Sequence, residues 1–323
     1  MTEKNITFQI QSFTKYLQKP NFEPENTSKI SLVFWFLLIF SANFLALTFG
    51  LITNFILNKI QYTGQNQVLE TISSIPIWLF LILASVQAPL TEEISFRLFL
   101  NPSKFKLSLA LFGFCFYFLS ILNSFDLVFS YSFIPILPIL FSNIINSLIL
   151  SITLYFTFKT NNNFYITIFD YIKTNFFWLF YGSSVIFGLI HLQNFTKLDF
   201  FTNYFWLLPI LVLPQTIVGV VLAYIRVKNG IVWSIMAHSF YNFITALPII
   251  VLSILPRNVL EMILKLNNSN GSIENKLNDL GIFEKAVLLA SSLTSLSILG
   301  LGFSCLVYLV FRYKKKATTK VAV

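Results

Sequence analysis

Charged residues are scarce in this sequence. They make up 11% of the 323 residues, whereas a soluble domain carries roughly 25%. Hydrophobic residues account for 56%, and 38 residues are phenylalanine. Because so few charges cannot keep a chain of this size in water, we expect a polytopic membrane protein in a lipid bilayer. The net charge of +9 then bears on topology and on contact with anionic lipid, and nucleic acid is not an expected partner.

Cysteine and histidine each occur only twice. Cys115 and Cys305 lie inside apolar runs with no ligand-type residue nearby, so the sequence indicates neither a disulfide framework nor a structural zinc site. His191 and His238 lie in apolar segments as well. An ionisable side chain within a membrane is energetically unfavourable, and such a residue is by default a functional candidate.

Long apolar runs fill most of the chain. Because about 20 apolar residues cross a bilayer as one helix, we expect an all-α polytopic transmembrane bundle of about eight spans. The predicted spans are 31–57, 72–99, 107–122, 133–158, 175–192, 203–225, 230–254 and 285–311. They form a single transmembrane domain, 31–311, with no obvious internal repeat. A tail or interfacial helix, 1–30, precedes this domain and a basic tail, 312–323, follows it.

The hydrophilic segments give an orientation. If the N-terminus is cytoplasmic, most of the 22 lysines and arginines also face the cytoplasm, so both chain ends are predicted inside. The longest hydrophilic connection, 256–284, is predicted to be a loop with a short surface helix at 259–266. The Phe-, Asn-, Ile- and Lys-rich composition is typical of AT-rich genomes. We therefore expect a bacterial plasma membrane, with an organellar membrane as the alternative.

Two glutamates and an arginine lie near the inner end of the second apolar run, in "TEEISFRLFL". Glu93 and Arg97 are i,i+4 neighbours on a helix and are predicted to form an ion pair. Glu92 points about 100° away from Glu93 and is free to face a cavity. Pro89, which has no N–H, suits the first turn of a helix that restarts there. The alternative is that the ion pair is purely structural.

The other polar residues lie on two later runs. His238 and Asn242 are i,i+4 neighbours, and Phe187 and His191 repeat that spacing. Counting the rise per residue places His191 deeper in the membrane than Glu92, unless its helix starts late or tilts. Taken singly, such residues more often make hydrogen bonds between helices. Their grouping with the glutamates on three runs makes a shared polar site the better interpretation.

In chain order, "EEISFR", "FGLIH" and "HSFYN" have the forms Glu-Glu-x-x-x-Arg, Phe-x-x-x-His and His-x-x-x-Asn. Together they resemble the CAAX-protease and bacteriocin-processing (CPBP, or Abi) intramembrane proteases, a family that includes the Ras-converting CAAX endopeptidase. The resemblance covers about residues 75–250. One departure concerns the stretch between the first two motifs, which lie on consecutive helices in the family. Here the segment 107–158 is predicted to be an inserted helical pair that reshapes the entrance to the site.

The resemblance implies hydrolysis of a peptide bond by a glutamate-activated water. Glu92, the first glutamate of its motif, would be the general base, because burial makes a carboxylate a better base. His191 would help to hold the water, and Glu93 would be fixed by Arg97. The expected substrate is a membrane-associated protein or peptide, prenylated or not.

His238 and Asn242 would donate hydrogen bonds to the developing oxyanion. No cofactor is expected, since the chain has no His-Glu-x-x-His helix, but two histidines and a glutamate also leave a zinc site open. Two non-hydrolytic alternatives stay open as well. One is a proton-coupled transporter that uses the same buried residues. The other is a catalytically silent family member acting in peptide immunity or binding.

Overall fold

A computed structural model describes residues 3–22, 29–60, 75–129, 136–195, 205–256, 259 and 280–321. The elements of these residues are all helical, which confirms the predicted all-α class. They are α1 (Glu3–Gln18), α2 (Leu32–Lys59), α4 (Ile77–Ile82), η1 (Leu83–Gln87), α5 (Ala88–Arg97), η2 (Leu98–Leu100), α6 (Lys104–Phe129), α7 (Ile136–Thr160), α8 (Asn162–Thr174), α9 (Phe176–Ile190), η3 (His191–Asn194), η4 (Phe205–Leu207), α10 (Leu208–Asn229), α11 (Ile231–Leu252) and α14 (Ile282–Val321).

Seven helical segments of the described chain are long and apolar enough to cross a membrane. Each of them overlaps one of the eight predicted spans. The remaining predicted span, 107–122, lies within α6, a long helix whose side chains are described only as far as residue 120. The predicted surface helix at 259–266 lies almost wholly outside the described residues. The chain is therefore an integral, multi-pass membrane protein.

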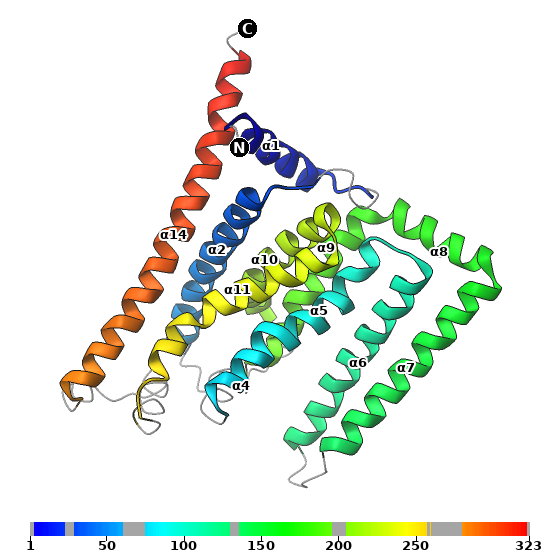
Figure 1. Cartoon of the computed structure of the whole chain (residues 1–323), viewed down its shortest axis with the longest axis horizontal. Coiled ribbons are helices and arrows are strands. Elements are labelled where there is room, and N and C mark those ends of the chain that lie inside the picture. Colours follow the sequence, from blue (N-terminus) through cyan, green and yellow to red (C-terminus); the bar gives the residue numbers. More distant parts are fainter. Residues whose placement is uncertain are drawn as a thin grey trace.

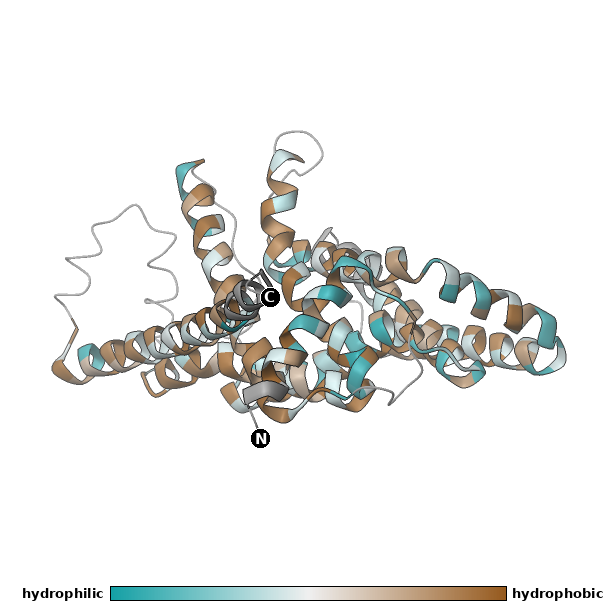
Figure 2. Cartoon of the chain, turned by 90° about the horizontal axis from the view of Figure 1, so that it is seen from above, coloured by the Kyte–Doolittle hydropathy of each residue, from teal (hydrophilic) through white to brown (hydrophobic). Residues whose placement is uncertain are grey.

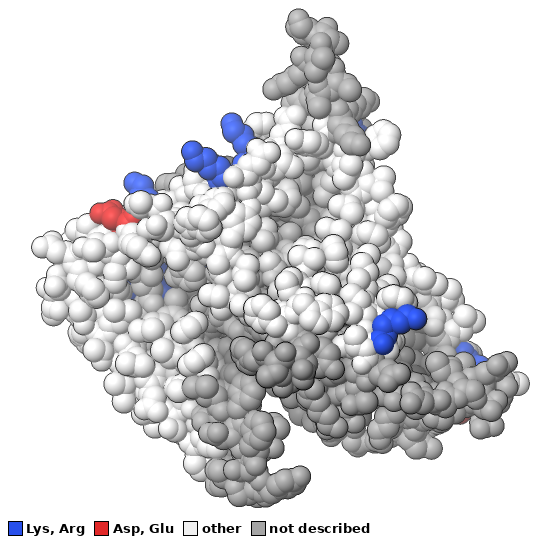
Figure 3. All heavy atoms as spheres, turned by 180° about the vertical axis from the view of Figure 1, so that it is seen from behind, with Lys and Arg blue, Asp and Glu red and all other residues white. Residues whose placement is uncertain are grey.

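Apolar side chains cover the outside of the bundle. Trp178, Phe311 and Phe141 are among many large hydrophobic residues with most of their surface exposed. Brown segments, which mark hydrophobic residues, run along nearly all the helices in the hydropathy view (Figure 2). Seen from behind, the charged side chains lie mainly near the upper and lower edges, with a wide uncharged band between them (Figure 3). Such a band suits contact with lipid chains, because no water is needed to solvate it.

The helices pack in an order that positions the polar motifs in the interior. Helix α2 contacts both α14 and α10, and α10 in turn contacts α9 and α11. Helix α5 packs against α11, α9 and α6. The antiparallel pair α6–α7 lies at the opposite edge of the molecule from α14 (Figure 1). This pair corresponds to the predicted insertion, and its inner helix lies directly against the helix that carries the two glutamates.

The N-terminal segment forms a helix, α1, that packs onto the end of the bundle. Its buried Ile10 and Tyr16 belong to the main hydrophobic core. The Tyr16 ring lies 5.4 Å from the ring of Tyr224 and 5.7 Å from that of Phe180, measured between centroids. Both chain ends lie at this same end of the molecule (Figure 1). That arrangement agrees with an even number of membrane crossings, as expected if both chain ends face the cytoplasm.

The helix that carries the glutamates contains an irregular turn. Leu83–Gln87 form a π-helical segment, after which the α-helical pattern resumes at Ala88 with Pro89 in its first turn. The Ala88 N–H donates to the carbonyl of Leu83, five residues earlier. The α-helix thus resumes at the place that the sequence predicted. The chain stays helical through this point, because the wider π-helical turn accommodates the proline.

Candidate active site

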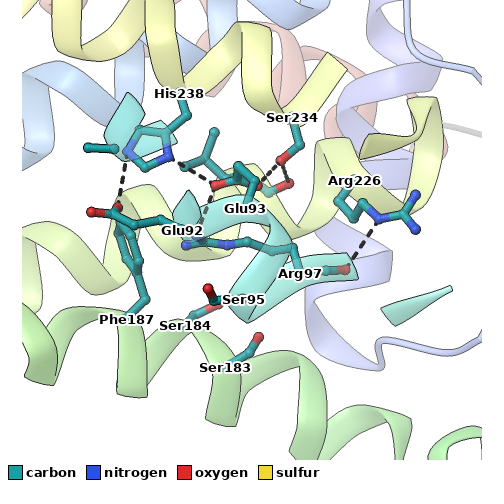
Figure 4. A network of polar contacts seen from close by, with 12 residues as sticks. Glu92, Glu93, Ser95, Arg97, Ser183, Ser184, Phe187, Arg226, Ser234 and His238 are labelled. Atoms are coloured by element: carbon teal, nitrogen blue, oxygen red, sulfur yellow. Dashed lines mark hydrogen bonds and ion pairs between the residues drawn. The ribbon is translucent and has the colours of Figure 1, made fainter. Parts of the chain in front are cut away.

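Three helices bring the candidate residues together. Glu92, Glu93 and Arg97 come from α5, His238 from α11, and Phe187 from α9. The side chains of Glu93 and Arg97 are fully buried, and those of Glu92 and His238 are buried almost completely. Figure 4 shows these residues facing one another between the three helices. Charged groups buried so deeply are tolerated only where partners compensate them.

Glu93 has a partner on every side. Its Oε1 lies 2.8 Å from Arg97 Nη1, which confirms the predicted i,i+4 ion pair, and 3.0 Å from His238 Nδ1. Its Oε2 accepts a hydrogen bond from the Ser234 hydroxyl (Figure 4). Sequence reasoning missed Ser234, although its position one helical turn before His238 places it on the same face of α11. With three donors around it, the Glu93 carboxylate is held in place and is unsuited to receive a further proton.

Arg97 is itself fixed from two directions. Its guanidinium lies 3.9 Å from the centre of the Phe187 ring, within the range of a cation–π interaction. The buried Arg226 of α10 donates from Nε to the Arg97 carbonyl, at 3.2 Å, and from Nη2 to the Leu98 carbonyl, at 3.3 Å. In the sequence, Arg226 directly follows the predicted span 203–225. In the structure it caps the carboxyl end of α5, where the helix leaves carbonyl groups unpaired.

The two nitrogens of His238 have different surroundings. Because a carboxylate can only accept, Nδ1 carries a proton and donates it to Glu93 Oε1. Nε2 points the other way and lies 3.6 Å from Glu92 Oε2, beyond a direct hydrogen bond. Glu93 therefore sets the ring orientation and leaves Nε2 facing Glu92.

Glu92 contrasts sharply with its neighbour. Its Oε2 is buried, and no group in the described part of the chain makes a hydrogen bond to it. Its Oε1 lies 3.4 Å from the hydroxyl of Tyr117, on α6. A buried carboxylate oxygen without a partner is uncommon in proteins. Glu93, whose carboxylate has three hydrogen-bonding or ionic partners, thus fits a structural role, and Glu92, which has an oxygen without a partner, fits a reactive role.

His191 lies at the carboxyl end of α9, and its ring turns back over the preceding helical turn. Nδ1 is 2.8 Å from the Phe187 carbonyl, which only accepts, so Nδ1 carries the proton and the Nε2 lone pair is left available. The Phe187 ring lies 4.7 Å from the ring of His191 and 5.6 Å from that of His238, between centroids. Glu92 is close enough to interact with His191 electrostatically.

Asn242 has a partner that the sequence did not predict. Its Nδ2 donates to the carbonyl of Ala84, at 2.7 Å. Ala84 lies in the π-helical segment, where the widened turn disturbs the regular pairing of backbone groups. Asn242 thus ties α11 to the turn that precedes Pro89 and the glutamates. An amide has two N–H donors, so one of them stays available for another acceptor.

The described residues do not offer a ligand set for zinc. Nowhere among them do three or more His, Cys, Asp or Glu side chains come close enough together to hold a metal ion. No chemical step proposed below depends on a metal.

The central part of the chain matches a known family. The family model described as type II CAAX prenyl endopeptidase Rce1-like matches residues 74–244. The matched region contains every candidate residue, from Glu92 to Asn242, and also the hairpin α6–α7. No curated protein and no solved structure matches the chain.

Proposed function

The chain belongs to the type II CAAX prenyl endopeptidase Rce1-like family, whose model covers more than half of its 323 residues, and from this we propose that it hydrolyses peptide bonds within the membrane through a water activated by Glu92. The family indicates a protease, and the apolar bundle indicates a substrate that is a membrane-associated protein or peptide. The assignment of the base goes further than the family match and depends on the contacts of the site.

One observation carries the proposal. Of the two neighbouring glutamates, Glu93 is surrounded by Arg97, His238 and Ser234, whereas the buried Glu92 Oε2 has no hydrogen-bond partner among the described residues. A general base must have an oxygen that can receive a proton. Glu92 meets this requirement and Glu93 does not.

The proposed reaction begins with a water between Glu92 and His191. Glu92 Oε2 takes one proton of the water, while His191 Nε2 accepts a hydrogen bond from the other. The water oxygen attacks the carbonyl carbon of the scissile bond, and the carbonyl electron pair moves onto oxygen. When this oxyanion collapses, the C–N bond breaks, and the departing amine takes the proton that Glu92 had received. Glu92 returns to a carboxylate, and no covalent enzyme intermediate forms.

Two side chains of α11 are proposed to stabilise the oxyanion. Asn242 would donate the amide N–H that Ala84 does not use. His238 would donate from Nε2, which requires a proton on both ring nitrogens, and the Glu93 carboxylate beside Nδ1 would balance that positive charge. Donors fixed before the reaction are effective because they need no reorganisation in the transition state.

The test is cleavage by purified protein in liposomes. Two quenched fluorescent probes are offered, a farnesylated peptide ending in Cys-aliphatic-aliphatic-X and the same peptide without the farnesyl group. Glu92→Gln and His191→Ala are expected to abolish cleavage at unchanged protein level. Glu284→Gln, at the start of α14 and far from the site, is the matched control. In parallel, membranes containing wild type and Glu92→Gln are compared for the peptides that accumulate.

The outcomes separate the possibilities. Cleavage that depends on Glu92 supports the proposal, and the preferred probe shows whether the farnesyl group is recognised. Retained turnover in Glu92→Gln would remove Glu92 as the base. If wild type cleaves neither probe, and its membranes contain the same peptides as those with Glu92→Gln, the protein is not an endopeptidase.

A further inference from the structure

Tyr117 of α6 reaches the glutamate site from the inserted hairpin. Its hydroxyl lies 3.4 Å from Glu92 Oε1, and the side chain of Gln193 lies near enough to interact with it. Gln193 follows His191 by two residues, in η3. Tyr117 belongs to none of the three sequence motifs, and the family's usual motif spacing has no place for its helix. The contact nevertheless joins the hairpin to Glu92, the residue proposed as the base.

The direction of these hydrogen bonds follows from the groups involved. A carboxylate can only accept, so the Tyr117 O–H donates to Glu92. The phenol has a single proton, so toward the neighbouring amide N–H of Gln193 its oxygen can act only as an acceptor. The result is a chain from Gln193 through Tyr117 to Glu92 Oε1, in which each bond polarises the next. It supplies the hydrogen bond that Glu92 receives within the described part of the chain.

Packing holds Tyr117 in this position. Gly113, one helical turn earlier on the same face of α6, allows α6 to approach α5 closely. A Cβ at Gly113 would lie 2.9 Å from both Ile94 Cγ2 and Ser95 Oγ. The Tyr117 ring packs edge-on against the Phe96 ring, with centroids 5.5 Å apart. The close approach of the helices thus fixes the distance between the Tyr117 hydroxyl and Glu92.

The hairpin is also braced from its outer helix. The Ser151 hydroxyl of α7 donates to the carbonyl of Ser108 of α6, at 2.7 Å, and this contact is buried. A hydrogen bond of this kind between helices resists sliding or rotation of α6 relative to α7. Tyr117 is therefore carried by a helix that is fixed on both of its sides.

We propose that Tyr117 is a positioning residue of the active site, which holds Glu92 Oε1 so that Oε2 faces His238 and the attacking water. This inference rests on the proposed function of Glu92 as the base. It gives the inserted hairpin a part in the reaction, since α6 supplies the group that orients the reactive carboxylate. The side of the active site next to Glu92 Oε1 would then differ in family members that lack the hairpin.

The experiment compares Tyr117→Phe with Tyr155→Phe in the liposome assay, using the probe that wild type cleaves. Phenylalanine keeps the ring that packs on Phe96 and removes only the hydroxyl. Tyr155 lies partly exposed on α7 of the same hairpin and is the matched control. We expect kcat of Tyr117→Phe to fall about tenfold, with KM unchanged, because one hydrogen bond to a charged group is lost. A purely structural tyrosine would leave kcat at the level of the control.

Gln193→Leu and the double variant test the hydrogen-bond chain. If Gln193 acts through Tyr117, adding Gln193→Leu to Tyr117→Phe leaves kcat about where Tyr117→Phe alone leaves it. Multiplication of the two losses would show that Gln193 acts independently, and would overturn the chain. Thermal unfolding of each variant shows whether the fold is retained.

Glu92→Gln is assayed alongside, so that two failures can be told apart. Cleavage by Glu92→Gln at the rate of Glu284→Gln would defeat the proposed function itself. If Glu92→Gln is inactive while Tyr117→Phe matches Tyr155→Phe, Glu92 is the base and Tyr117 has no positioning role.

Discussion

The Arg97 guanidinium neutralises a carboxylate that has no access to water. Both side chains are fully buried, and Nη1 lies 2.8 Å from Glu93 Oε1. Replacing Arg97 with methionine leaves the negative charge of Glu93 buried with only His238 and Ser234 as partners. It also removes the cation at 3.9 Å from the Phe187 ring. Removing one partner of a buried ion pair costs about 3–5 kcal/mol, and we expect Arg97→Met to lower the free energy of unfolding by that amount.

The double variant Glu93→Gln, Arg97→Met should have a higher free energy of unfolding than Arg97→Met alone. A neutral amide at position 93 removes the uncompensated charge, while its oxygen still accepts from His238 Nδ1–H. We expect the double variant to regain about 1–2 kcal/mol, because the desolvation penalty of an unpaired charge disappears. The two substitutions are thus expected to be strongly non-additive, as is usual for side chains in contact.

The measurement is equilibrium unfolding in mixed micelles, followed as the fraction of denaturing detergent rises. Lys173→Met, on the exposed face of α8, is the control for loss of a cation and should leave the unfolding free energy unchanged. A loss in Arg97→Met below about 1 kcal/mol, the level of an exposed pair, would refute the account of Glu93 as a buried, compensated charge. Simple addition of the two single effects would refute it as well.

Two further predictions concern the same site. Asn242→Ala should lower kcat by about 10²–10³-fold, because it removes a proposed oxyanion donor and the hydrogen bond to the Ala84 carbonyl. The control Asn146→Ala, on the exposed face of α7, should leave kcat unchanged. Equal rates for the two variants would exclude the oxyanion role. Exhaustive treatment with EDTA and 1,10-phenanthroline should leave cleavage unchanged, because the described residues offer no group of three metal ligands. A loss of activity that added zinc restores would instead support a metalloprotease.

Local features of the site could be predicted from the sequence. The Glu93–Arg97 pair follows from helical spacing alone, since residues four apart lie on one face. The seven apolar helices follow from run length and composition. The association of the three motifs in one site came from their resemblance to a family, because spacing along the chain does not say which helices meet.

Contacts between helices could not be read from the sequence. Ser234, Arg226 and Tyr117 approach the site from three different helices, and their roles depend on how each helix is rotated about its axis. Gly113 gave no signal as a single glycine in an apolar run, yet it allows the close approach of α6 to α5. The π-helical turn was equally hidden, although Pro89 marked the place where the helix resumes.

The hairpin α6–α7 combines features that could be predicted from the sequence with one that could not. Its helices were visible as apolar runs, and its departure from the family's spacing was visible as well. Its function was not, because a tyrosine in an apolar run is usually a packing residue. Among the described residues, the 3.4 Å contact between the Tyr117 hydroxyl and Glu92 Oε1 connects the hairpin α6–α7 to the proposed chemistry.

The rate of peptide cleavage by Glu92→Gln, relative to wild type and to Glu284→Gln, tests the central claim most directly. Glutamine keeps the size of the side chain but cannot take a proton from water. The account predicts that Glu92→Gln loses about 10²–10⁴-fold or more in rate, the contribution of a general base, while Glu284→Gln cleaves at the wild-type rate. Turnover by Glu92→Gln at the rate of the control would contradict it.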